Sequence, residues 1–142
     1  MAMAMASERP LAAVKRCLVA LGSCVLFLWQ LPAAGAPDEV SQHEIRYLLT
    51  QLETSGCEFF RNGDWYDARR ARQHIQRKYA WLVKRDLVAS TEQFIERAAS
   101  GSSRSGEPYL VRCEQGEAMP SADWLTNELT RLRNDAAASG AD

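Results

Sequence analysis

CEFFRNGDWY, at residues 57–66, is the stretch that decides the fold of this chain. At its centre stand Asn62 and Gly63, two residues that tolerate the positive φ of a tight turn, and aromatic-rich arms flank them. An Asn-Gly pair between such arms is the strongest short-range signal for a β-hairpin. The arms are short, and an isolated hairpin is only marginally stable, so we expect this hairpin to pack against helices.

The segment before the hairpin has the periodicity of an amphipathic helix. We expect this helix over residues 40–54, because its large apolar residues recur at helical spacing on one face. These residues are Ile45, Leu48, Leu49 and Leu52. Ser41 and Glu44 have the spacing of a capping box at its start, and Gly56 is the expected stop.

The segment after the hairpin predicts a second helix, over residues 68–85, with Asp67 as its N-cap. Its expected buried stripe consists of Ala68, Ala71, Ile75, Tyr79 and Leu82. A short third helix follows over residues 91–99, where Ser90 and Gln93 have the spacing of a capping box.

The last part of the chain predicts one strand and one more helix. A polar, turn-rich loop at residues 101–108 leads into an expected strand at residues 109–113. Ser121 is the expected cap of a final helix that ends near residue 133. Its inward-facing residues are expected to be Trp124, Leu125, Leu129 and Leu132.

This order of elements predicts the fold class. We expect a small, mostly helical α+β domain of about four helices with a two- or three-stranded antiparallel sheet. The late strand is expected to pair with the hairpin, because a lone strand would leave its backbone groups unpaired.

The N-terminal residues have the order of a secretory signal. Lys15 and Arg16 end a short positive segment, an apolar run follows at residues 17–31, and small residues come after Pro32. The run is shorter than the roughly 20 residues that a membrane span needs. We therefore predict a cleavable signal peptide over residues 1–36, cut within Ala34 to Ala36; the alternative is an uncleaved N-terminal anchor.

Removal of the leader would leave one domain and a tail. Residues 37–134 suit a single domain with one modest core, and residues 135–142 are too poor in apolar surface to pack, so we expect them to be disordered. The chain has 17 basic and 18 acidic residues, a formal net charge of −1. This balance argues against bulk nucleic-acid binding, and no membrane span is expected in the mature chain.

Two cysteines remain outside the leader, Cys57 and Cys113. An exported chain with two cysteines usually joins them, and neighbouring strands would bring these two to bonding distance. We predict one disulfide, which closes a loop of roughly 57 residues and is worth on the order of 4 kcal/mol. The alternative, a nucleophilic cysteine activated by His74, requires a thiol that stays reduced in an oxidising compartment.

Several strings of this sequence together resemble a known family. They are Ser55-Gly56-Cys57-x-Phe59-x-Arg61-Asn62-Gly63, Tyr66-x-Ala68, His74-Ile75-x-x-Lys78-Tyr79, the run at residues 91–100, and Ser103-x-Ser105-Gly106-x-Pro108-Tyr109-x-Val111-x-Cys113. The chain resembles the YfeK-like family of small secreted proteobacterial proteins over about residues 45–132. The family is a domain of unknown function. The resemblance implies a Gram-negative periplasmic location and supplies no activity and no catalytic residues.

The sharpest surface feature is the basic second helix. On a helical wheel Arg70, His74, Arg77 and Trp81 share a side away from the apolar stripe. A tryptophan beside arginines is typical of a binding patch, here for an anionic partner such as an acidic protein, a lipid headgroup or a cell-wall polymer. The alternative is a solvated basic face with Trp81 beneath another helix.

Other candidate sites have weaker support. The serine-rich loop around Ser102 and Ser105 follows the C-terminal end of a helix, where the dipole repels anions, so we interpret it as a polar loop. His43 and His74 are the only histidines, and no metal-ligand spacing accompanies them. We therefore predict no metal and no cofactor.

These observations favour a non-catalytic periplasmic binding module for a protein or an envelope component. The candidate partner-binding residues are Arg70, His74, Arg77 and Trp81, and no catalytic residue is assigned. Two alternatives stay open. One is a small cell-envelope hydrolase that uses a carboxylate and His74. The other is an inhibitor or immunity protein directed against a periplasmic toxin.

Overall fold

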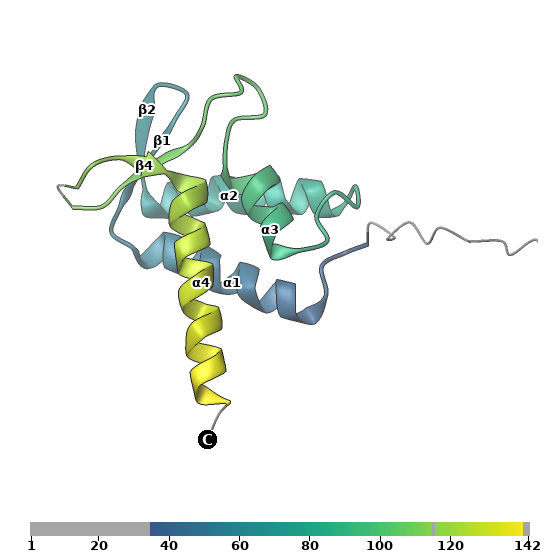
Figure 1. Ribbon diagram of the computed structural model, residues 1–142. Coiled ribbons are helices and arrows are strands. Elements are labelled where there is room, and N and C mark those ends of the chain that lie inside the picture. The colour runs from purple at the N-terminus through teal and green to yellow at the C-terminus, as the bar shows by residue number, and fades with distance from the viewer. Residues whose placement is uncertain (1–34, 115, 141–142) are drawn as a thin grey trace, which may run out of the picture. The chain divides into compact units, whose positions relative to one another are not determined.

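The computed structural model describes residues 35–114 and 116–140, and nearly all of the predicted signal peptide lies outside this part. The elements along the chain are α1 (Glu39–Thr54), β1 (Glu58–Arg61), β2 (Asp64–Asp67), α2 (Ala68–Val83), α3 (Thr91–Phe94), the π-helical turn η1 (Ile95–Ala99), β3 (Leu110–Arg112), β4 (Met119–Pro120) and α4 (Ser121–Ser139). The predicted class is confirmed: the domain is α+β and mostly helical, with an antiparallel sheet (Figure 1).

The sheet is built around the predicted hairpin. β1 pairs with β2 through a turn in which Asn62 and Gly63 have φ values of +51° and +95°. β3 pairs with the other edge of β1, as expected, and the two-residue β4 pairs with β3, so the strand order is β2-β1-β3-β4. The sheet thus has one short strand more than the sequence predicts.

The predicted disulfide is present between Cys57 and Cys113. Glu58 lies opposite Arg112 in the β1–β3 register, so the two cysteines stand one position beyond this pair, with their Cα atoms 4.2 Å apart. The strand pairing therefore places the two sulfurs within bonding distance.

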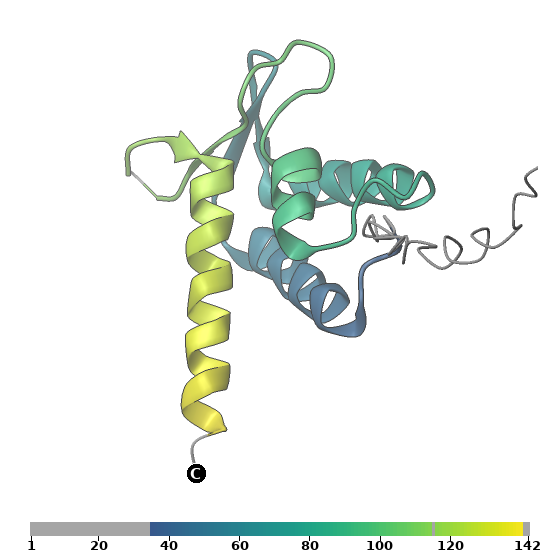
Figure 2. The ribbon, with the colours of Figure 1, turned by 45° about the vertical axis from the view of Figure 1, so that its right-hand side comes forward.

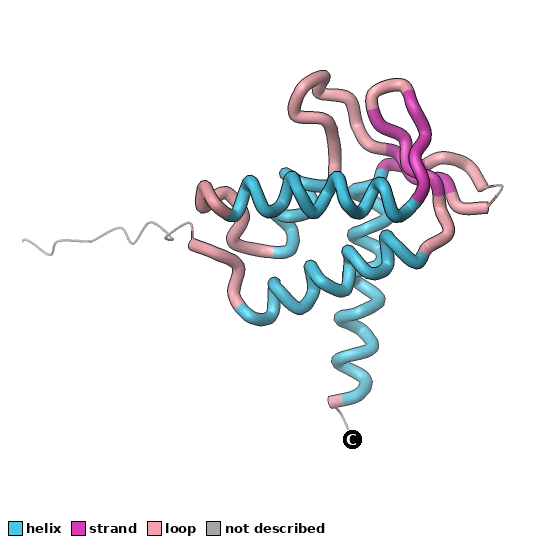
Figure 3. The backbone as a smooth tube through the Cα atoms, turned by 180° about the vertical axis from the view of Figure 1, so that it is seen from behind, coloured by secondary structure: helices cyan, strands magenta, loops and turns pink. Residues whose placement is uncertain are grey.

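The helices lie against one another and against the sheet. α1 and α2 run side by side in opposite directions, joined by the hairpin at one end (Figure 3). The predicted apolar face of α1 is buried, together with Ile75 and Leu82 of α2, Phe94 of α3 and Leu125 of α4. One core therefore connects α1, α2, α3 and α4 to β1 and β3.

Asp67 performs the capping role that the sequence predicts for α2. Its Oδ1 accepts a hydrogen bond from the backbone N–H of Arg70 at 2.8 Å, immediately after β2 ends. Because no loop separates β2 from α2, the first turns of α2 begin directly beside the hairpin. This junction positions the candidate site described below.

The predicted capping box of α1 is wrong. The N-cap is Asp38, whose Oδ1 accepts from the N–H of Ser41, and Glu44 points into the protein with a relative exposure of 6%. Glu44 accepts two hydrogen bonds from Arg133 of α4, at 2.7 and 2.9 Å, and one from the hydroxyl of Thr91 at 2.5 Å.

We call Glu44, Thr91, Glu92 and Arg133 the Glu44 clamp, since Arg133 also pairs with Glu92 at 2.9 Å. The clamp joins α1, α3 and α4. Hydrogen bonds from Arg133 hold the pKa of the Glu44 carboxyl below its ordinary value, against the opposing effect of burial. Each charge in the clamp thus has a partner of opposite sign.

Two further helix ends differ from prediction. Ser121 opens α4 without capping it: its Oγ donates to the carbonyl of Ala99 at 2.6 Å, and Pro120 is the N-cap residue. The cap at Ser90 is confirmed, because its Oγ accepts from the N–H of Gln93. The helix that it starts continues through the π turn η1 instead of remaining α-helical to residue 99.

The disorder predicted from residue 135 is not what the structure shows, because α4 remains helical to Ser139 and projects away from the rest of the domain (Figure 2). Residues 134–140, beyond the clamp residue Arg133, are exposed, so packing does not hold this end. The run of three alanines, which has high intrinsic helix propensity, accounts for the extension. Among the described residues, no helix has the combined length and apolar character that a membrane span requires.

Candidate functional site: an arginine-rimmed pocket beside helix α2

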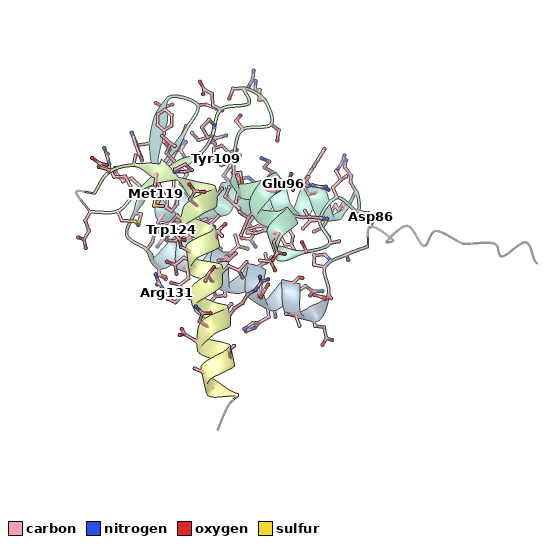
Figure 4. All side chains as sticks on the ribbon, in the orientation of Figure 1. Asp86, Glu96, Tyr109, Met119, Trp124 and Arg131 are labelled. Carbon is pink, nitrogen blue, oxygen red and sulfur yellow. A yellow bond between two sulfur atoms is a disulfide. The ribbon has the colours of Figure 1, made fainter. Side chains whose placement is uncertain are left out.

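A pocket of about 130 Å³ opens where the hairpin meets α2 and the segment that leads into β3. Arg70, His74 and Arg77 reach it from α2, where their spacing of four and three residues places them on one face. Arg61 reaches it from the end of β1, and Tyr109 from the residue before β3. Figure 4 labels Tyr109 near the point where the sheet meets the helices.

The floor of the pocket, which is the buried part of its lining, is mainly apolar, and the hydroxyl of its one buried serine, Ser121, is bonded to the carbonyl of Ala99. Leu52 of α1, Phe59 of β1 and Ile75 of α2 line it, and all three are buried in the domain core. A group that entered the pocket would therefore contact hydrocarbon at its inner end.

The mouth of the pocket is cationic. Arg70 and Arg77 are exposed and Arg61 is partly exposed. The guanidinium carbons of Arg61 and Arg70 lie 5.3 and 4.8 Å from the centre of the Tyr66 ring, so two cations share one aromatic side chain. Over residues 35–114 and 116–140, none of the three arginines is in an ion pair and no acidic side chain lines the pocket.

His74 lies between the mouth and the floor. Its Nε2 is 3.0 Å from the hydroxyl of Tyr109, and the two rings meet edge to face. Burial, together with the positive charges of Arg61, Arg77 and Lys78, lowers the pKa of His74 to about 4. The imidazole is thus neutral at pH 7, and it is a hydrogen-bonding group with no charge.

Lys78 fixes the side of the pocket formed by Tyr109. Its Nζ donates to the carbonyl of Gly101 at 2.6 Å and lies 5.4 Å from the centre of the Tyr109 ring. Burial lowers the pKa of this amine and raises the pKa of the Tyr109 phenol. The hydrogen bond from Lys78 thereby connects α2 to the loop that precedes β3. The ammonium group of Lys78 thus already has an acceptor within the fold.

The structure separates the four residues predicted to form one patch. Arg70, His74 and Arg77 line the pocket, whereas Trp81 lies farther along α2 and does not. Trp81 is 51% exposed, so the alternative that placed it beneath another helix is wrong. Arg85 covers its ring, with the guanidinium carbon 3.9 Å from the centroid.

Three residues of the site were absent from the sequence prediction: Arg61, Tyr66 and Tyr109. A helical wheel reports neighbours on one helix, and these residues come from the strands and from the segment before β3. Two signals were available. The strings that carry the family resemblance contain all three residues. In addition, an Asn-Gly hairpin that leads directly into a capped helix must place its arms beside the first turns of that helix.

The serine-rich loop is folded upon itself. The Oγ of Ser102 accepts from the N–H groups of Arg104 and Ser105, each at 3.3 Å, and Ser105 donates to Asn62 of the hairpin turn at 3.0 Å. These groups are engaged within the domain, as in the polar-loop interpretation. The described residues contain no cluster of three or more histidine, cysteine or acidic side chains that would hold a metal ion.

These features define a class: a small α+β domain with one disulfide and a basic pocket between a hairpin and the helix that follows it. The chain belongs to the family of unknown function DUF5329, whose model matches residues 39–133. This range contains every element that lines the pocket, and it confirms the resemblance seen in the sequence.

A relative supports the same assignment. Over 86 residues the chain is 33% identical to the uncharacterized protein YfeK of Salmonella typhimurium, and the match covers 60% of this chain and 70% of that protein. No solved structure matches the chain.

Proposed function

We propose that this protein is a non-catalytic binding module of the periplasm and that its pocket receives an anionic group of a partner protein or envelope component. The observation that carries the proposal is the unbalanced charge at the pocket. Arg61, Arg70 and Arg77 surround an opening that, among the described residues, has no acidic side chain in its lining. Three cations without a counterion favour an anion from outside the chain.

Arginine suits this role better than lysine would. The guanidinium group presents a planar set of donors that matches a carboxylate or a phosphate in two-point contact, and it keeps its charge at any physiological pH. Stacking of Arg61 and Arg70 on Tyr66 limits the conformations of both side chains. A partly ordered side chain loses less entropy when it binds a ligand.

A hydrolase receives less support from this geometry. That alternative pairs His74 with a carboxylate, and in the described part of the chain the nearest polar partner of His74 is the hydroxyl of Tyr109. The pocket lining there contains no carboxylate to orient the imidazole or to activate water. No observation favours an immunity protein over other binding modules.

The disulfide supports the proposed compartment. Such bonds persist in oxidising spaces and are rare in the cytosol. Together with the leader-like order of residues 1–36, the bond favours export through a cleaved signal. Fractionation of cells followed by N-terminal sequencing tests this. We expect a periplasmic chain that begins within residues 35–37, and a full-length cytoplasmic chain would contradict it.

The test of binding is a comparison of two charge-matched variants. The variant R70Q/R77Q removes two charges from the pocket, and R69Q/R104Q removes two exposed charges outside it. Oxidised protein is immobilised, exposed to periplasmic extract, and the retained components are quantified by mass spectrometry.

We expect the wild type and the R69Q/R104Q control to retain the same component, and R70Q/R77Q to retain at least about tenfold less of it, since charge-assisted hydrogen bonds contribute about 1.5–3 kcal/mol each. Equal retention by all three proteins would show that the pocket arginines do not form the binding site.

A further inference from the structure

The size of the pocket limits what it can hold. An engineered apolar cavity of about 150 Å³ in another protein binds benzene, and the pocket here is about 130 Å³. Sites for drug-sized molecules are larger, roughly 300–1,000 Å³. The enclosed part of a ligand is therefore about one aromatic ring or a short acyl chain, not a sugar polymer.

The chemistry of the lining divides the ligand into two parts. Leu52, Phe59 and Ile75 offer hydrocarbon in the buried part of the lining, and the hydroxyl of the buried Ser121 there is already bonded to the carbonyl of Ala99. A wholly polar anion such as inorganic phosphate would leave this apolar surface unused. The arginines stand at the exposed end. A fitting ligand carries its charge at one end and an apolar group at the other.

A singly charged head fits better than a doubly charged one. The site is partly buried, and the free energy needed to remove an anion from water rises steeply with its charge. A carboxylate is planar, carries one charge and accepts the two parallel donors of a guanidinium group. The neutral pair of His74 and Tyr109 adds hydrogen bonding next to the arginines without more positive charge.

We propose that the pocket binds a carboxylate that carries an apolar group of about one ring, with the carboxylate at Arg61, Arg70 and Arg77 and the apolar group against Leu52, Phe59 and Ile75. This inference rests on the proposed function and names its ligand class. The same chemistry has two sources: a free small carboxylic acid, or the C-terminal residue of a polypeptide with an apolar side chain.

Calorimetric titration of the oxidised protein tests the proposal with four small probes. Phenylacetate has both parts of the ligand, phenylacetamide lacks the charge, acetate lacks the apolar group, and inorganic phosphate lacks the apolar group but carries more charge. We expect phenylacetate to bind with a dissociation constant on the order of 1 mM, as befits a ligand of few heavy atoms, and the other three to bind at least about tenfold more weakly. Acetate or phosphate binding as tightly as phenylacetate would overturn the ligand class.

A fifth probe, acetyl-Ala-Phe with a free carboxylate, distinguishes the two sources. Tighter binding of this peptide than of phenylacetate assigns the site to a polypeptide C-terminus, and weaker binding assigns it to a free acid. Either result supports the shared chemistry, and failure of both probes to bind would overturn it.

Two variants locate the binding. R70Q/R77Q should weaken phenylacetate binding at least about tenfold, while R69Q/R104Q leaves it unchanged. Ala71 lines the pocket and is partly exposed, so A71M fills the space for the ring and keeps every charge. We expect A71M to weaken phenylacetate binding about fivefold or more without affecting the weak binding of acetate. Unchanged phenylacetate binding in both pocket variants would overturn the proposal.

This outcome is separable from that of the proposed function. If no small carboxylate binds but retention from extract still depends on Arg70 and Arg77, the ligand class is wrong and the binding module stands. If neither binding depends on these arginines, both proposals fail.

Discussion

The Glu44 clamp and the arginine pocket are two clusters of charge with opposite organisation. In the clamp, one buried carboxylate accepts from Arg133 and Thr91, and Arg133 also pairs with Glu92. In the pocket, three arginines stand together and, within the described part of the chain, none forms an ion pair. Both clusters join elements that are distant in sequence, but only in the clamp does every charged group have a partner of opposite sign.

The difference teaches how to separate charges that stabilise a fold from charges that serve a ligand. A buried carboxylate with a full set of partners is a contact between helices, and its removal is expected to affect stability. Cations gathered around an apolar opening repel one another, so they add little to stability and are free to meet an anion. The predictions below test this division, from the largest expected effect to the smallest.

The disulfide is the strongest single tie on the pocket side of the molecule. It joins the chain just before β1, whose residues line the pocket, to the chain just after β3, which follows the pocket residue Tyr109. We expect C57S/C113S to lower the free energy of unfolding by about 4 kcal/mol, as chain entropy requires for a loop of this length. Urea denaturation measures the change. Wild-type protein in reductant should show the same loss, and a midpoint unmoved by either treatment would contradict the expectation.

Arg133→Met breaks the clamp and leaves Glu44 buried with Thr91 as its remaining partner. We expect a loss of about 2 kcal/mol, less than for a fully buried pair because half of the Arg133 side chain is exposed. Carboxylate binding at the pocket should not change. Arg69→Met at an exposed position is the control, with an expected change within about 0.5 kcal/mol. Urea denaturation measures both variants. Equal denaturation midpoints for Arg133→Met and Arg69→Met would mean that the clamp does not stabilise the fold.

The two clusters should also differ in the pH range that they control. The folded state holds the pKa of His74 at about 4, below its ordinary 6.5, so the unfolded chain binds more protons between these values. Stability should therefore fall as the pH drops from about 6.5 to about 4. The clamp carboxylates of Glu44 and Glu92 have lowered pKa values, so their contribution is present above about 4.5 and disappears only in more acidic solution.

Unfolding free energies measured from about pH 2 to pH 8 resolve the two ranges. His74→Gln should flatten the profile between pH 6.5 and about 4, and it should leave the acid-side loss in place. The expected change is smaller than that of the clamp variant, because His74 is only partly buried. If the free energy of unfolding still falls as steeply between pH 6.5 and about 4 in His74→Gln, His74 is not the source of this pH dependence.

Removal of the pocket charges should have the smallest effect on stability. We expect R70Q/R77Q to change the free energy of unfolding by no more than about 0.5 kcal/mol, with a tendency to stabilise because repulsion is relieved. The same variant should lose ligand binding. A loss of several kcal/mol would place these arginines with the clamp and remove the distinction between the two clusters.

The sequence predicted the parts of the fold that depend on local signals. The Asn62-Gly63 turn, the Asp67 cap and the buried stripe of α1 were all predicted from residues within one or two turns of each other. The disulfide followed from strand pairing and from the number of cysteines.

Long-range partners explain the failures. Glu44 has the spacing of a capping box with Ser41, but Arg133, 89 positions away, gives its carboxylate a stronger, charge-assisted partner. The pocket was half predicted, since the helical wheel found Arg70, His74 and Arg77 but not Arg61 and Tyr109 on other elements. The wheel also added Trp81, because it ignores distance along the helix axis.

The most direct test of the division between clamp and pocket is a titration of the oxidised, ¹⁵N-labelled protein with phenylacetate, followed by NMR. Amide signals should shift at the hairpin, along α2 from Arg70 to Arg77 and at Tyr109, and those shifts should vanish in R70Q/R77Q and persist in Arg133→Met. Shifts that gather around Glu44 and Arg133, or that survive in R70Q/R77Q, would contradict the assignment of the pocket as the binding site.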